Sequence, residues 1–175
     1  MNDIIENMIS RRSIRAFKPE LPSGEILDEI MRDGSFAATG RNFQSPLMIC
    51  ITQPDLLRQL RVLNAQIMGK DDNFDPFYGA PAVIVVLADK SRPTYLYDGS
   101  LVMGNLMLAA HSLGLGSCWI HRAKEEFETP WGKKILSGLG ITGDYEGIGN
   151  CAIGYAAGEM PPPPPRKNNY VYKIK

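Results

Sequence analysis

The chain has 175 residues, with 19 Lys or Arg and 19 Asp or Glu, so its formal net charge is zero. At this length one domain buries roughly 70% of the surface of the unfolded chain, so its core needs no disulfide or structural metal. The balanced charge argues against a nucleic-acid partner, and no apolar run reaches the roughly 18 residues of a membrane span. The N-terminus lacks the basic and then apolar pattern of a signal peptide. We therefore expect one soluble, cytoplasmic domain with no nucleic-acid or membrane partner.

The sequence pattern of the N-terminal part of the chain predicts two helices before the first strand. Apolar periodicity indicates a helix over residues 3–11. A second helix begins after Ser23, a favourable N-cap, and continues to about Phe36. After a polar loop, we expect a strand over 47–52 and a helix over 54–67 that has proline in its first turn.

The rest of the chain alternates strands and helices. The clearest strand covers residues 82–88, a continuous and mostly β-branched apolar run that is typical of a buried strand. The remaining predicted elements are a helix over 98–113 that ends at Gly114, a strand over 117–121, a helix over 124–139 and a strand over 148–155. This order predicts a three-layer α/β/α sandwich rather than a helical bundle or an all-β fold.

The C-terminal segment differs in composition from the rest of the chain. Five consecutive prolines at 161–165 predict an extended polyproline II segment without internal hydrogen bonds. Residues 170–174 alternate in the manner of a strand. This combination favours a tail that crosses to another surface and docks there by strand addition, with a frayed end as the alternative.

Two sequence features that could indicate a cofactor or catalytic site are better explained as structural features. Residues 138–143 fit the pattern G-x-G-x-x-G, but they follow a predicted helix, whereas dinucleotide binding needs a strand before the glycines. We interpret them as a helix end and a loop. Cys50, Cys118 and Cys151 lie in apolar runs and predict buried thiols rather than a metal site. A Cys–His nucleophile is an alternative that no spacing supports.

Three segments carry the polar groups best suited to a ligand. Residues 11–15 place three arginines and a serine hydroxyl within five positions, which suits a phosphate group. Arg166 and Lys167 form a second basic pair after the prolines. Residues 39–44 offer side-chain amides that suit the edge of a flavin pyrimidine or ribityl hydroxyls. The alternatives are a cationic helix end, a surface pair and an ordinary polar loop.

Together these segments resemble the nitroreductase family of FMN-dependent oxidoreductases. The resemblance keeps one order and spacing over nearly the whole chain, in RRSIRAF (11–17), TGRNFQSP (39–46), FYGAPAVIVV (77–86), DGSLVMGNLMLAAHSLGLGSCWI (98–120) and GYAAGE (154–159) with the basic, proline-rich stretch after it. It implies an α+β fold with a mixed, mainly antiparallel sheet and an intertwined homodimer. It further implies that residues 1–175 form a single FMN-binding domain, in which 156–175 is an extension that docks on the partner subunit.

The resemblance also implies which residues hold the phosphate end of FMN. Arg11 and Ser13, with Arg12 alongside, would hold the phosphate and the ribityl end. Arg166 and Lys167 would return to the same phosphate after the proline segment. FMN would sit at the subunit interface, where both chains contact it.

At the flavin ring, the resemblance implies that Arg15 approaches N1 and O2, and that the backbone of Ile120, His121 and Arg122 faces N5. Asn64 occupies the position at which some members carry an asparagine that contacts the flavin ring. Those members also carry a lysine three residues later, where this sequence has Ile67. Some members also carry a glutamate near N5, where His121 lies in this sequence. The partner subunit would supply four residues of its polar loop: Thr39, Gly40, Asn42 and Gln44.

The sequence contains no activated nucleophile, and flavin-mediated hydride transfer needs none. The resemblance implies an oxidoreductase that passes a hydride from NADH or NADPH through FMN N5 to a nitroaromatic, quinone or similar conjugated acceptor in a ping-pong scheme. Arg15, as a cation near N1, and His121, near N5, are the candidate catalytic residues. The candidate aromatic walls of the substrate pocket are Phe43, Phe74, Phe77 and Tyr78. The alternatives are a dehalogenase or enone reductase, and a flavin store or redox sensor with little turnover.

Overall fold

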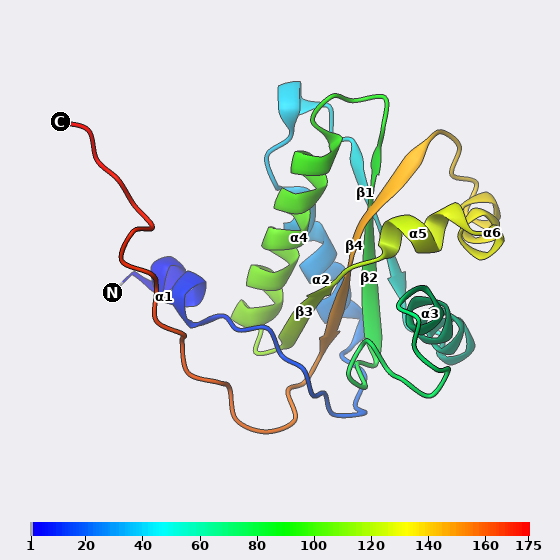
Figure 1. The fold of residues 1–175 in the computed structure, drawn as a ribbon, viewed down its shortest axis with the longest axis horizontal. Coiled ribbons are helices and arrows are strands. Elements are labelled where there is room, and N and C mark those ends of the chain that lie inside the picture. The colour runs from blue at the N-terminus through cyan, green and yellow to red at the C-terminus, as the bar shows by residue number, and fades with distance from the viewer. Residues whose placement is uncertain (1) are drawn as a thin grey trace.

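A four-stranded antiparallel sheet lies between two layers of helices in the computed structural model, which describes residues 2–175 (Figure 1). The elements in chain order are α1 (Asp3–Ser10), α2 (Gly24–Ser35), η1 (Gly40–Asn42), β1 (Pro46–Ile51), α3 (Pro54–Ile67), β2 (Ala82–Asp89), α4 (Tyr95–Ser112), β3 (Gly116–Ile120), α5 (Ala123–Glu128), α6 (Pro130–Gly138) and β4 (Tyr145–Gly154). Across the described residues, no helix combines the length and the apolar character that a membrane crossing requires.

The layers follow from the alternation of side chains along β2, which is buried on both faces. Val83, Val85 and Leu87 belong to a core shared with α3, α5 and α6. Ile84 and Val86 belong to a second core shared with α2 and α4. Burial on both faces explains why this run is apolar throughout, and the predicted three-layer α/β/α architecture is confirmed.

The sheet order β1-β2-β4-β3 places β1 and β3 at the edges. All pairings between the four strands are antiparallel, and an isolated bridge between Ser13 and Ser117 is the one parallel pairing among the described residues. The prediction of a mainly antiparallel sheet is thus confirmed, and the parallel bridge lies outside its four strands. The Ile14 N–H donates to Ser117 O at 2.9 Å and covers the outer edge of β3. Within residues 2–175, no strand pairs with the outer edge of β1.

The helix predicted over 124–139 was wrong in one respect, because the structure divides it into α5 and α6. Thr129 has an extended backbone, and its hydroxyl accepts the N–H of Gly132 at 3.3 Å as the N-cap of α6. Pro130 occupies the first turn, where its missing N–H costs nothing. The break lets α5 run across β4 while α6 turns toward α3 (Figure 1).

Two further elements begin three residues earlier than predicted. α4 begins at Tyr95 instead of residue 98, and β4 begins at Tyr145 instead of residue 148. The added part of β4 contains Gly147, where a Cβ would collide with the backbone of Ala123. This glycine therefore permits the close approach of α5 to the sheet.

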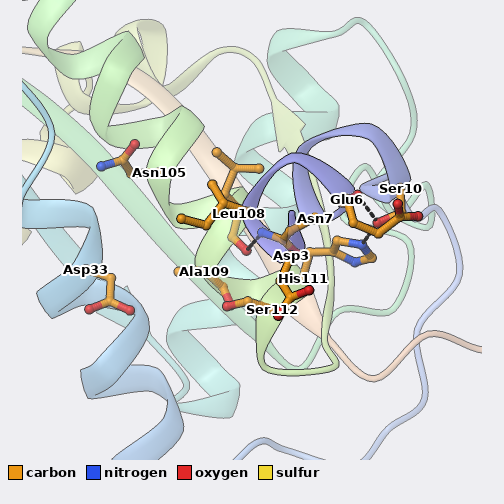
Figure 2. Close-up of a pocket in the computed structure, with 11 residues that line it drawn as sticks. Asp3, Glu6, Asn7, Ser10, Asp33, Asn105, Leu108, Ala109, His111 and Ser112 are labelled. Atoms are coloured by element: carbon orange, nitrogen blue, oxygen red, sulfur yellow. Dashed lines mark hydrogen bonds between the residues drawn. The ribbon is translucent and has the colours of Figure 1, made fainter. Parts of the chain in front are cut away.

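Helix α1 contacts the C-terminal half of α4 through polar groups, beside a pocket of about 670 Å³ (Figure 2). Asn7 Nδ2 donates to Leu108 O at 3.1 Å, and the Ser10 hydroxyl lies 2.8 Å from His111 Nε2. Burial, with smaller contributions from Arg11 and Arg12, lowers the pKa of His111. The large apolar side chains of α1 are exposed: Ile4, Ile5, Met8 and Ile9. The apolar face that predicted this helix is thus left uncovered by its own chain.

The C-terminal segment leaves the body after the Ala157 N–H donates to Ala16 O at 2.9 Å. Residues 158–175 are exposed and run past α1, away from the sheet (Figure 1). Residues 170–174 form no strand within this chain. Strand pairing of this segment with a second subunit therefore stays a prediction.

Candidate functional site

The basic residues after α1 lie in an extended segment anchored to the edge of the sheet. Ile14 is buried and packs on Gly116, where a Cβ would collide with its side chain. Because side chains alternate along an extended backbone, the burial of Ile14 turns Ser13 and Arg15 outward. The bridge between Ser13 and Ser117 fixes this register.

A first recess of about 400 Å³ brings the two basic clusters together. Its lining consists of Arg11, Arg12, Ser13, Arg15, Pro161, Pro162, Pro164 and Arg166. Residues from the two ends of the chain thus meet in one basic recess. Lys167 lies outside this lining, with its ammonium 5.5 Å from the ring centre of Tyr170.

Two guanidinium atoms at this recess are buried without hydrogen-bond partners. They are Arg11 Nη1 and Arg12 Nε. The Arg12 Nη1 donates to Ile9 O at 2.7 Å and to Arg11 O at 2.6 Å, so Arg12 also caps the end of α1. An unpaired buried donor of a charged group is costly, and an anion bound in the recess would lie beside both guanidinium groups.

A second recess of about 190 Å³ adjoins the first through the side chain of Arg15. Its lining consists of Arg15, Met68, Phe74, Pro76, Tyr78, Cys118, Trp119, Ile120, His121 and Arg122. Two of the four predicted aromatic walls, Phe74 and Tyr78, lie here. Phe77 is fully buried in the core, and Phe43 lies 4.6 Å below the Arg92 guanidinium, so these two expectations were wrong for this recess.

Behind the second recess lies a buried polar cluster that the sequence did not indicate. Asn64, Glu126 and Asn150 are all fully buried. Asn64 Nδ2 donates to Glu126 and, at 3.0 Å, to His121 O, while its Oδ1 accepts Arg122 Nε at 2.9 Å. Asn64 therefore supports the chain behind the recess rather than lining it. Burial raises the pKa of Glu126 to about 7, against the opposing effect of its hydrogen bonds from the two asparagines.

The polar loop 39–44 lies at the opposite end of α4 from this site. Buried Asp98 holds the loop, since it accepts the N–H of Gly40 at 3.0 Å and the hydroxyls of Ser45 and Thr94 at 3.1 and 3.0 Å. Asp98 and His111 are 13 positions apart on α4, which corresponds to about 20 Å of helix. One chain therefore does not bring the loop to the basic recess.

The loop is nonetheless rigidly built. Arg41, Asn42 and Gln44 have φ values of 51°, 56° and 50°, in the left-handed region that few residues other than glycine adopt. The Gln44 amide donates to Asn42 Oδ1 at 3.1 Å, and the Gln44 N–H donates to Thr39 Oγ1 at 3.1 Å. A surface loop held in such a conformation is typical of a binding element.

The first, basic recess and the second recess, which Phe74 and Tyr78 line, share Arg15 and lie on an α+β sandwich. Together they form a candidate site whose basic and aromatic linings suit an anionic ligand that carries a planar ring. The family follows from comparison with known proteins: the family model described as the nitroreductase family matches residues 8–155. The chain belongs to the nitroreductase family, and the resemblance noted in the sequence is confirmed.

Individual relatives agree with this assignment. An FMN reductase (NADPH) of Bacillus subtilis is 28% identical over 143 residues, which cover 73% of this chain and 57% of that protein. The chain thus spans little more than half the length of this relative. A crystal structure of a nitroreductase with bound FMN from Bacteroides fragilis has a TM-score of 0.88 at 22% identity, with all of both chains covered. A nitroreductase with bound FMN from Desulfitobacterium hafniense has a TM-score of 0.85 at 26% identity, over 99% of this chain and 100% of its own.

Proposed function

We propose that the protein binds FMN and transfers a hydride from NADH or NADPH to a nitroaromatic, quinone or other conjugated acceptor. The observation that carries this proposal is the pair of recesses joined at Arg15, one basic and one with aromatic walls. The family membership and the FMN named in the related structures support it.

The basic recess fits the phosphate group of FMN. A phosphate monoester carries about −1.5 to −2 charges and three acceptor oxygens at neutral pH. Arg11 Nη1 and Arg12 Nε are buried donors without partners, and Arg166 adds a third guanidinium to the lining. Ser13 lines the same recess and would supply a hydroxyl donor there. We propose that Lys167 acts only through the local positive charge, since its ammonium is directed to Tyr170.

The adjoining recess fits one edge of the flavin ring. Bound FMN would supply the hydride chemistry, while the protein binds it and tunes it. Arg15 places a positive charge where the two recesses meet, which suits the proposed position of N1 and O2. The peptide between His121 and Arg122 lies at the end of β3 on the rim, which suits the proposed position near N5.

We propose that a homodimer completes the site. Two features support a second subunit: the apolar face of α1 is exposed, and the loop 39–44 lies at the far end of α4 from the basic recess of its own chain. The free edge of β1 offers a docking place for residues 170–174 of that subunit. A recess of about 500 Å³ runs beside β1 and includes Ile49, Leu56 and Trp131 in its lining, so it can receive apolar side chains of the tail.

The proposal is tested with purified protein under anaerobic conditions. We expect FMN to co-purify at about one per subunit, NADH or NADPH to bleach its absorbance, and a nitroaromatic to restore it. Bleaching without recovery by nitroaromatics or quinones would favour a specialised reductase such as a dehalogenase. Bound FMN that neither nucleotide reduces would indicate a store or sensor, and a protein that binds no FMN at micromolar concentration would refute the proposal.

A further inference from the structure

The buried cluster behind the flavin recess is built from three separate elements around one carboxylate. Asn64 comes from α3, Glu126 from α5 and Asn150 from β4, and all three are fully buried. Asn150 Nδ2 donates to both carboxylate oxygens of Glu126 at 3.0 and 3.2 Å, and Asn64 Nδ2 donates to the same carboxylate. Three polar side chains in an otherwise apolar interior need a reason beyond packing.

The cluster also holds one backbone carbonyl. His121 O accepts Asn64 Nδ2 at 3.0 Å and Asn150 Nδ2 at 3.4 Å, so it points into the protein. In a trans peptide the next N–H points in the opposite direction. The Arg122 N–H is therefore directed toward the recess that His121 and Arg122 line, and within the described residues no hydrogen bond uses it as a donor.

The backbone at Arg122 is held in an unusual conformation. Its φ of 83° lies in the left-handed region, which is unfavourable for a residue with a side chain. The bond from Arg122 Nε to Asn64 Oδ1 at 2.9 Å ties this residue to the cluster. Hydrogen bonds thus connect the Arg122 guanidinium at the rim of the recess to the Asn64 amide, and the Asn64 amide to the Glu126 carboxylate in the interior.

We propose that Glu126, acting through Asn64 and Asn150, is a positioning residue that fixes the His121–Arg122 peptide with its N–H directed at flavin N5. The inference rests on the proposed FMN-dependent function and assigns no contact between Glu126 and the flavin. It also gives Asn64 a supporting role in place of the ring contact expected from the sequence.

The same geometry requires Glu126 to be ionised. Its carboxylate accepts from both amides, whereas a protonated carboxyl group must donate one O–H bond. Asn150 Oδ1, on the amide that already donates to Glu126, is an acceptor that is buried without a partner. To use it, the Asn150 amide must rotate, which removes its donor from His121 O. Protonation of Glu126 therefore loosens the peptide.

This dependence places a functional titration near neutral pH, because burial raises the pKa of Glu126 to about 7. The charged groups that face Glu126 are Arg122, which lowers its pKa, and Glu125, which raises it. Above pH 7 the ionised carboxylate holds both amides. Below pH 7 the protonated form releases one of them, so flavin reduction slows.

The test compares Glu126→Gln with Glu128→Gln, a matched control on the exposed face of the same helix. Each holoprotein is mixed with NADH or NADPH in an anaerobic stopped-flow experiment from about pH 5.5 to about pH 8.5, which brackets the titration. We expect Glu126→Gln to bind FMN within about threefold of wild type, since the cluster lines neither recess, yet to reduce it about tenfold or more slowly. The wild type and Glu128→Gln should lose rate below pH 7, and Glu126→Gln should lose this pH step. Its flavin midpoint potential should also shift.

Asn150→Ala provides a second route if Glu126→Gln fails to fold. It removes one donor to His121 O and leaves Asn64 and Glu126 paired, so we expect slower reduction and a smaller pH step. Variants that match Glu128→Gln in rate, midpoint potential and pH profile would overturn the inference while the proposed function stands. A wild type that binds no FMN, or that neither nucleotide reduces, would overturn both.

Discussion

The two ends of helix α4 differ in how complete their surroundings are. At the C-terminal end, the chain forms the basic recess and the adjoining second recess. The buried cluster of Asn64, Glu126 and Asn150 supports the His121–Arg122 peptide at the rim of the second recess. At the N-terminal end, Asp98 holds the polar loop 39–44 in a strained conformation, and this loop does not line the basic recess of the same chain. This difference underlies our proposal that each chain contributes its basic recess to one site and its loop 39–44 to the site of a second copy.

Removal of the tail should have the largest effect on this arrangement. Five polyproline residues span roughly 15 Å and carry residues 170–174 away from their own subunit. We expect deletion of 161–175 to raise the dimer dissociation constant at least about tenfold and to lower FMN affinity. Sedimentation velocity with flavin absorbance measures both quantities.

Deletion of residues 168–175 alone is the matched control for the tail, because it keeps Arg166 at the basic recess. We expect it to weaken the dimer as the longer deletion does, with less loss of FMN affinity. An FMN-loaded dimer of unchanged stability after the longer deletion would show that the tail makes no contribution.

At the N-terminal end of α4, Asp98→Ala should destabilise the fold by about 3 kcal/mol, because the buried Ser45 hydroxyl and two partly buried donors, on Gly40 and Thr94, lose their common acceptor. Asp28→Ala, on the exposed face of α2, is the control. Urea denaturation of the apoprotein measures the difference. Equal midpoints for the two variants would show that the loop does not depend on Asp98.

At the C-terminal end, Arg11→Ala should weaken FMN binding by about 2–3 kcal/mol, or roughly 30- to 150-fold, through the loss of a partly buried charged donor. Arg58→Ala, an exposed arginine on α3, provides the control. Fluorescence titration of the apoprotein with FMN gives both dissociation constants. A change of less than about twofold in Arg11→Ala would place the phosphate elsewhere.

A smaller effect is expected at the junction of the two recesses. Arg15→Ala should lower the flavin midpoint potential by on the order of 30 mV, because a positive charge near N1 favours the reduced, anionic flavin. Arg15→Lys keeps the charge and should recover most of the loss. Spectroelectrochemical titration with saturating FMN tests this, and equal potentials in all three proteins would contradict the proposed position of the ring.

The sequence predicted the layers and the basic recess because local signals specify them. The apolar run of β2 identifies a strand buried on both faces. The arginines at 11–15 can be recognised as a basic cluster from the local sequence alone. The break before Pro130 was missed because the apolar periodicity of the two helices continues across it. A proline inside a predicted helix was the signal that marks it.

The supporting cluster escaped prediction because tertiary burial alone gives these residues their significance. Glu126 resembles any charged residue of a polar helix until α3 and β4 close over it. Asn150 offered the one usable signal, since a lone amide within an apolar strand needs an internal partner. Asp98 was assigned to a helix start, whereas the structure uses its carboxylate to hold the loop of residues 39–44.

The central claim is that Arg11 of one subunit and the loop 39–44 of the other form a single site. Subunits carrying Arg11→Ala are mixed with subunits carrying Asn42→Ala and Gln44→Ala, and the heterodimer is isolated by two affinity tags. If the loop acts across the interface, one site of the heterodimer carries every substitution and the other is wild type. We expect one FMN per heterodimer to bind with wild-type affinity, although both parent homodimers bind weakly. Uniformly weak binding in the heterodimer would contradict the claim.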